Sequence, residues 1–109
     1  MKVAVIGSRS LTVPDLGKYL PPETTEIVSG GASGVDTSAQ EYAIANNIKL
    51  TEFLPEYDKF GRRAPLKRNL LIIEYADLTL AFWDGKSHGT RFVIDKCLEL
   101  GINIKVVVS

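Results

Sequence analysis

Short apolar runs alternate along the chain with segments of helical periodicity. The apolar runs predict strands at residues 2–7, 26–28, 48–54, 77–82 and 102–108. Between them, the spacing predicts a short helix ending near residue 20 and longer helices at 34–46, 65–76 and 90–100. Residues 56–63 show no clear periodicity, and we expect an ordered loop there. The predicted buried stripes are Leu66, Leu70 and Ile73 in the helix at 65–76, and Val93, Ile94, Cys97 and Leu98 in the last helix.

Regular alternation of strand and helix indicates a parallel sheet with right-handed crossovers and helices on both faces. We therefore predict a single α/β domain over residues 1–109, a Rossmann-like three-layer sandwich whose five strands lie in the order 3-2-1-4-5. In such a sheet, ligands bind outside the carboxyl ends of the strands, where the first strand neighbours the fourth. The residues that carry the function are therefore expected in the loops at that edge.

A glycine-rich turn follows the second predicted strand and leads into a helix. It reads Ser29-Gly30-Gly31-Ala32-Ser33-Gly34-Val35-Asp36. Glycines let another molecule approach the backbone closely, and the helix start offers free N–H groups, so the turn is typical of a phosphate or carboxylate site. A turn without a ligand stays open as the alternative, with Ser33 capping the helix and Asp36 completing a capping box.

Other loops at the same edge carry further candidate residues. Gly7, Ser8 and Arg9 follow the first strand, and Thr90 is placed to cap a second helix start that includes Gly89. Trp83 fits either a stacking platform for a base or a hydrophobic lid. The predicted ligand-binding set is Gly7, Ser8, Arg9, Ser29, Gly30, Gly31, Gly34, Asp36, Arg68, Asn69, Trp83, Ser87, Gly89 and Thr90.

Basic residues cluster between positions 59 and 68. Lys59, Arg62, Arg63, Lys67 and Arg68 have no acidic residue among them, which fits an anion site or a solvated basic face. Asn69 falls at the edge of the predicted apolar stripe, where its side chain needs a partner in a ligand or in a neighbouring backbone turn.

The composition of the chain, and the motifs that it lacks, limit the classes of function that it can have. Thirteen basic residues balance thirteen acidic ones, so any nucleic-acid role depends on a local patch. A single Cys, no long apolar stretch and no signal-peptide pattern predict a cytoplasmic protein that does not enter a membrane.

The chain has no Walker A lysine motif, no G-x-S-x-G elbow and no Cys/His pair at metal spacing, and we predict no metal and no resident cofactor. Asp36 and Asp84 are the candidate catalytic carboxylates.

Four motifs together resemble the SLOG superfamily. They are Val-Ile-Gly-Ser-Arg at 5–9, the glycine turn at 29–36, Arg-Arg-Ala-Pro-Leu-Lys-Arg-Asn at 62–69 and Ser-His-Gly-Thr at 87–90. That superfamily includes the DNA-processing Smf/DprA proteins, the lonely-guy phosphoribohydrolases that activate cytokinins, and small YspA-like stand-alone domains, which the chain resembles most. The resemblance implies a nucleotide-type small-molecule ligand and a homodimer.

One departure from the family bears on catalysis. The lonely-guy enzymes carry a glutamate shortly after their Gly-Thr, whereas this chain continues Arg91-Phe92-Val93-Ile94-Asp95. The group expected to assist cleavage of the N-glycosidic bond is therefore missing. We expect a nucleotide-binding module that serves as a sensor. The alternatives are an N-glycoside hydrolase using Asp36 or Asp84, and a binder of single-stranded DNA that uses the basic cluster.

Overall fold

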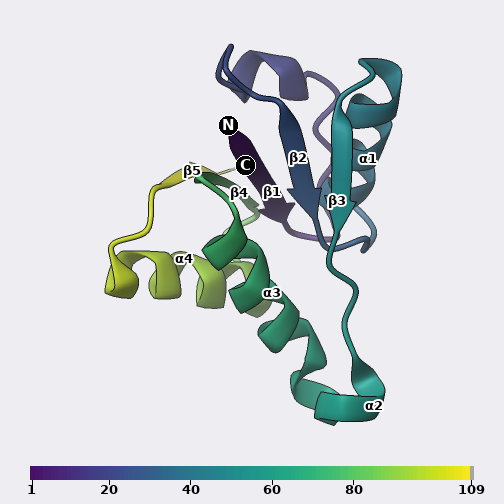
Figure 1. The fold of residues 1–109 in the computed structure, drawn as a ribbon. Helices are drawn as coiled ribbons and strands as arrows, with labels where there is room; N and C mark the ends of the chain where they lie inside the picture. Colours follow the sequence, from purple (N-terminus) through teal and green to yellow (C-terminus); the bar gives the residue numbers. More distant parts are fainter. Residues whose placement is uncertain (109) are drawn as a thin grey trace.

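The computed structural model describes residues 1–108 and confirms the predicted sheet (Figure 1). Its strands are β1 (Lys2–Gly7), β2 (Glu26–Ser29), β3 (Lys49–Glu52), β4 (Leu78–Trp83) and β5 (Ile104–Val108). All neighbouring pairs are parallel, and the order is β3-β2-β1-β4-β5. The sheet order therefore reverses between β1 and β4, as predicted.

Helices cover both faces of the sheet. The longer helices are α1 (Val35–Ala45), α3 (Ala64–Tyr75) and α4 (His88–Leu100), and the short ones are η1 (Leu16–Tyr19), α2 (Tyr57–Phe60) and η2 (Gly61–Arg63). Helix α1 packs on one face, while α3 and α4 pack together on the other (Figure 1). None of the helices in residues 1–108 has the length and apolar character needed to cross a membrane.

The central strand β1 is buried on both faces. Val3 and Val5 join the core beneath α1, while Ala4 and Ile6 join the core beneath α3 and α4. A strand that is apolar on both faces leaves no room for polar chemistry inside the sheet. Polar groups therefore gather where the strands end.

Two stretches of secondary structure differ from the prediction. Residues 56–63, expected to be a loop, form α2 and η2, which are too short for a helical period to show in the sequence. The helix expected before residue 20 is one 3-10 turn, Leu16–Tyr19, because prolines at 14 and 21–22 leave little room for a longer helix.

The buried faces of two helices also differ from the prediction. In α3 the buried residues are Ala64, Arg68, Ile72 and Ile73, so Ile73 is buried as expected but Leu66 and Leu70 are only partly buried. In α4 the buried residues are Thr90, Val93 and Cys97, whereas Ile94 is partly buried and Leu98 is 69% exposed. A charged residue thus takes a core-facing position in α3, which an apolar pattern does not reveal.

Candidate functional site

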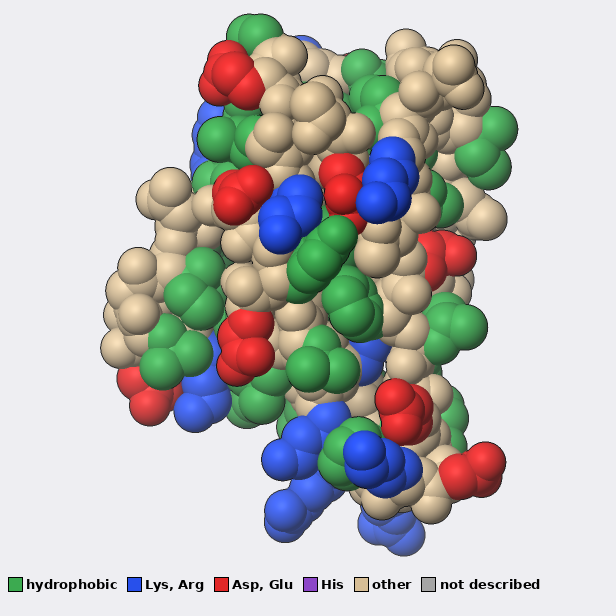
Figure 2. Space-filling model, in the orientation of Figure 1, with side chains coloured by type: hydrophobic (Ala, Val, Ile, Leu, Met, Phe, Trp, Pro, Cys, Tyr) green, Lys and Arg blue, Asp and Glu red, His purple; other side chains and the backbone are tan. Residues whose placement is uncertain are grey.

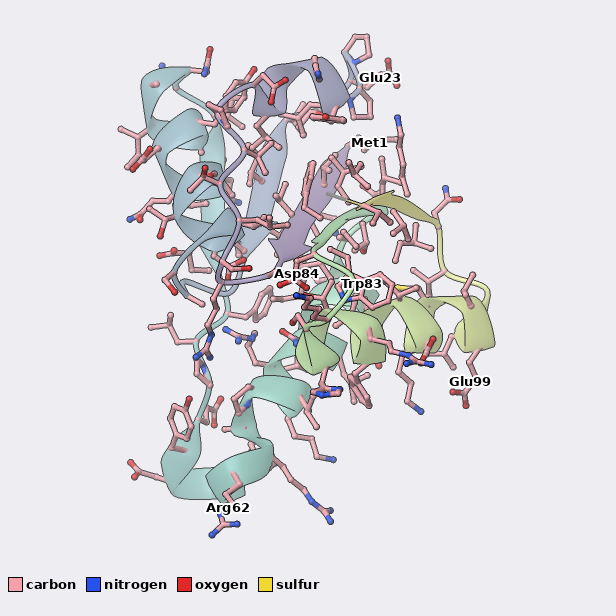
Figure 3. All side chains as sticks on the ribbon, turned by 180° about the vertical axis from the view of Figure 1, so that it is seen from behind. Met1, Glu23, Arg62, Trp83, Asp84 and Glu99 are labelled. Atoms are coloured by element: carbon pink, nitrogen blue, oxygen red, sulfur yellow. The ribbon has the colours of Figure 1, made fainter. Side chains whose placement is uncertain are left out.

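A cleft of about 440 Å³ opens at the carboxyl ends of β1, β2 and β4, and we call it the main cleft. Its walls are the loops after these strands and the starts of α3 and α4. Figure 3 shows Trp83 and Asp84 at this end of the sheet, beside the start of α4. Predicted site residues that line the main cleft are Gly7, Arg9, Gly30, Asp36, Arg68, Asn69, Asp84, Ser87, Gly89 and Thr90.

A smaller cavity of about 290 Å³ adjoins the main cleft, and we call it the side cavity. It is lined by Arg9, Gly30, Gly31, Ala32, Ser33, Leu54, Pro55, Tyr57 and Arg68. Arg9, Gly30, Ala32 and Arg68 line both hollows, so the two are contiguous.

The start of α4 is held by a network around Asp84. Its Oδ1 accepts the N–H groups of Lys86 and Ser87, each at 2.8 Å, and its Oδ2 accepts the Ser10 hydroxyl at 2.9 Å. The N–H groups of Ser87 and Lys86, together with the Ser10 hydroxyl, lower the pKa of Asp84 to about 2. Asp84 therefore stays ionised and fixes the loop that leads into the helix.

Ser87, and not Thr90, caps α4. The Ser87 Oγ accepts the Thr90 N–H at 3.5 Å, and Thr90 lies buried inside the first turn. The N–H groups of His88 and Gly89 make no hydrogen bond to any described residue. These two N–H groups are free to bind an anion at the positive end of the helix dipole.

Gly89 has no steric reason within the protein to be a glycine. It lies in the first turn of α4 with ordinary helical geometry, and a Cβ there meets no described atom within 4 Å. Glycine in a helix costs about 0.5–1 kcal/mol relative to alanine. Gly89 also lines the main cleft, so the absence of a side chain leaves the helix backbone open to that cleft.

Arg68 is a buried side chain that ties α3 to the glycine turn. Its Nη1 donates to the carbonyls of Gly30 and Phe53, the latter at 3.4 Å, and its Nε donates to Asn69 Oδ1 at 2.8 Å. A Cβ at Gly30 would overlap the guanidinium. Gly30 therefore admits Arg68, and Asn69 Oδ1 accepts from it instead of bonding a backbone turn. Because Asn69 also lines the main cleft, its contact with a ligand stays a prediction.

Arg9 is the exposed cation of the site. It lies on the loop after β1, lines both hollows, and forms no ion pair with the described residues. A Cβ at Gly34, which has φ +73°, would collide with the Arg9 backbone. Gly34 thus packs the glycine turn against the loop that carries Arg9. The Arg9 guanidinium is left available to a ligand, because it is exposed and forms no ion pair with the described residues.

Asp36 brings a carboxyl group to the main cleft. Its side chain is 7% exposed, and its Oδ2 accepts the Ala32 N–H at 3.1 Å. Burial raises the pKa of Asp36, while the hydrogen bond from Ala32 and the charge of Arg68 oppose the rise. The capping box with Ser33 is wrong: the N-cap of α1 is Gly34, without a side-chain hydrogen bond, because the glycine backbone bends the chain directly into the helix.

The remaining predicted residues support the loops rather than line the main cleft. Ser8 Oγ accepts the Asp84 N–H at 3.2 Å, and Ser29 Oγ accepts the Gly31 N–H at 3.5 Å. Trp83 donates its Nε1–H to the Ser87 carbonyl at 3.0 Å and so braces the start of α4. Gly31 lines the side cavity, and Gly34 lines neither hollow. Gly7 does line the main cleft, and it also lets β1 approach Val35 of α1 and the Phe82 carbonyl closely.

Several lining residues were not among the predicted set. In the main cleft these include Ser10, Pro65 and Leu66, and in the side cavity Leu54 and Tyr57. Ser10 directly follows Arg9, a signal that was present in the sequence. Tyr57 gave no such signal, because it lies in the stretch that lacks periodicity.

The fold and the cleft define a Rossmann-like α/β domain with cationic and backbone N–H groups at its switch point. Comparison of the chain with protein families, characterised proteins and solved structures finds no match. Within residues 1–108, no three His, Cys, Asp or Glu side chains are grouped to hold a metal ion.

Proposed function

We propose that this protein binds a nucleotide or a nucleotide derivative, with its phosphate in the main cleft at the start of α4. The observation that carries the proposal is Gly89, whose missing side chain leaves open space beside two free N–H groups at a helix N-terminus. A phosphate oxygen there accepts those N–H groups and gains from the helix dipole. The same site serves a sensor, in which nucleotide occupancy is read by a partner.

The arginine side chains at the main cleft also support a phosphate in that position. Arg68 already donates to the Gly30 and Phe53 carbonyls and to Asn69, whereas Arg9 forms no ion pair with the described residues. An unpaired guanidinium at the mouth of a cleft matches the geometry and charge of a phosphate. SLOG membership is part of this proposal, since all four motifs that carry the resemblance contribute residues to the main cleft.

The matched pair Arg9→Ala and Arg62→Ala tests the proposal. Both residues are exposed, but Arg62 lies on η2 at the projecting end of the molecule, outside both hollows (Figure 3). Titration calorimetry is expected to show that Arg9→Ala binds the common nucleoside monophosphates about tenfold more weakly than wild type. A loss of this size corresponds to one modest hydrogen bond to a charged group. Arg62→Ala is expected to bind as wild type. Equal affinities in all three proteins would contradict the proposal.

A second candidate function follows from Asp36. A buried carboxyl whose pKa is raised lines the same cleft and is suited to act as a general acid in N-glycoside hydrolysis. Asp84 is less suited, because its carboxylate accepts three hydrogen bonds and its pKa is about 2. Chromatography of wild-type protein incubated with nucleoside monophosphates decides between binding and hydrolysis, since only hydrolysis releases free base.

Single-stranded DNA binding depends on a different surface. Figure 2 shows Lys and Arg side chains gathered at the lower end of the molecule, over α2 and the start of α3. Lys59, Arg62, Arg63 and Lys67 are exposed there, whereas Arg68 is buried at the cleft. An affinity for oligonucleotides that falls steeply with salt and is lost in Arg62→Ala would favour this function instead.

A further inference from the structure

We propose that the side cavity holds the planar base of the ligand, with Tyr57 as its stacking residue. This inference rests on the proposed function and extends it, because it makes the ligand a molecule with an aromatic base and not a simple sugar phosphate. The phosphate lies in the main cleft, and the base lies beyond Arg9 in the side cavity.

The side cavity has an apolar wall that the fold itself does not use. Leu54 is 63% exposed and Tyr57 is 57% exposed, and together with Pro55 they line this cavity. The Tyr57 hydroxyl makes no hydrogen bond to any described residue. A tyrosine and a leucine exposed together on the wall of a cavity form a surface suited to the face of an aromatic ring.

The short helix that carries Tyr57 contributes nothing to the core. Helix α2 has no buried residue, begins two residues after Pro55 and ends at Phe60, with Gly61 at φ +57° as its C-cap. Its Phe60 ring is covered by the ammonium groups of Lys59 and Lys67, at 5.2 and 5.9 Å from the ring centroid. The segment is thus ordered by local contacts and presents Tyr57 to the cavity rather than to the core.

The two hollows are placed for one ligand. Arg9 and Arg68 line both, so a molecule whose phosphate lies beside Arg9 in the main cleft extends past it into the side cavity. The Gly30 backbone and the Arg68 guanidinium packed against it form part of the wall that the two hollows share, and the exposed Arg9 lies beside both. A guanidinium next to an aromatic ring is also favourable, because the ring face attracts cations.

The side cavity also offers polar groups for the edge of a base, because Ser33 is among its lining residues. Ser33 is exposed, and neither its hydroxyl nor its N–H makes a hydrogen bond to a described residue. A cavity lined by both apolar side chains and free polar groups suits a nucleobase, which has apolar faces and a polar edge.

Two variants and two kinds of probe test this inference. Tyr57→Ala removes the ring, and Tyr57→Phe keeps the ring but removes the hydroxyl. Calorimetry compares ribose 5-phosphate, which has no base, with the four common nucleoside monophosphates. Stacking of a base on an aromatic side chain predicts a loss of about 5- to 100-fold in nucleotide affinity for Tyr57→Ala. Tyr57→Phe is expected to bind nucleotides as wild type, and ribose 5-phosphate is expected to bind all three proteins equally.

The outcomes separate this inference from the proposed function. If wild type binds ribose 5-phosphate as tightly as every nucleotide, or if Tyr57→Ala binds nucleotides unchanged, the base site is refuted and the phosphate site stands. If Tyr57→Ala loses both kinds of probe equally, Tyr57 does not act through a base. If wild type binds no phosphate-bearing probe, both proposals fail. Because Tyr57 is largely exposed, the melting temperatures of the free variants are expected to match wild type.

Discussion

Gly89→Ala is expected to make the protein more stable and its ligand site weaker. The added methyl meets no described atom within 4 Å, and the residue already has helical geometry. Replacing a helical glycine by alanine stabilises a protein by about 0.5–1 kcal/mol, largely by restricting the unfolded chain. For a domain of this size, that corresponds to a rise of about 2–4 °C in melting temperature.

The same methyl lies in the main cleft, where the phosphate is proposed to contact the helix backbone. Moving the phosphate away weakens its hydrogen bonds to the N–H groups of His88 and Gly89. A hydrogen bond to a charged group contributes about 1.5–3 kcal/mol, so the loss of one lowers affinity by about 10- to 100-fold.

Gly101→Ala is the matched control, at the other end of the same helix. A Cβ at Gly101 also meets no described atom within 4 Å, but φ is +69°, so alanine is strained there and costs about 1 kcal/mol. Thermal melts and calorimetry with nucleoside monophosphates are expected to show lower stability and unchanged affinity. The reasoning about Gly89 is refuted if Gly89→Ala binds nucleotides as wild type, or if it melts at a lower temperature.

Two further predictions concern the loops around the cleft. Gly30→Ala displaces the Arg68 guanidinium from the Gly30 and Phe53 carbonyls, and we expect urea denaturation to show a loss of about 2–3 kcal/mol; a loss below about 0.5 kcal/mol would contradict this. Asp84→Ala removes a carboxylate whose pKa is about 2 in the folded protein, below the ordinary value of 3.8. The stabilising effect of this group is therefore complete above about pH 4 and lost as the pH falls towards 2, so the urea midpoints of variant and wild type are expected to differ at pH 7 and to converge below pH 4. A difference in urea midpoint that stays the same from pH 7 to below about pH 4 would contradict a stabilising role for the ionised Asp84 carboxylate.

The fold follows from the sequence because its signals are long and repeated. Each buried strand is an apolar run bounded by glycine, proline or polar residues, and each longer helix shows its period over about three turns. The sheet order was predictable because parallel strands with right-handed crossovers leave few arrangements. The short helices α2 and η2 were not predictable, since three or four residues cannot show a helical period.

The position of the site was predictable, but several roles within it were not. Polar and glycine-rich loops at strand ends marked the edge where the cleft lies. The burial of Arg68 was hidden, because a guanidinium enters the interior only where carbonyls accept its protons, and those of Gly30 and Phe53 come from distant parts of the chain. The choice of Ser87 over Thr90 as cap depends on Asp84, which pulls the Ser87 N–H into the loop before the helix begins.

Nuclear magnetic resonance of the ¹⁵N-labelled wild-type protein tests the phosphate site most directly. Titration with a nucleoside monophosphate is expected to shift the amide signals of His88 and Gly89 in a saturable way and to leave Gly101 unchanged. The shifts are expected to extend to Ser33 and Tyr57 at the side cavity. Saturable shifts confined to the basic residues between Lys59 and Lys67, or no saturable shift at His88 and Gly89, would contradict a phosphate site at the start of α4.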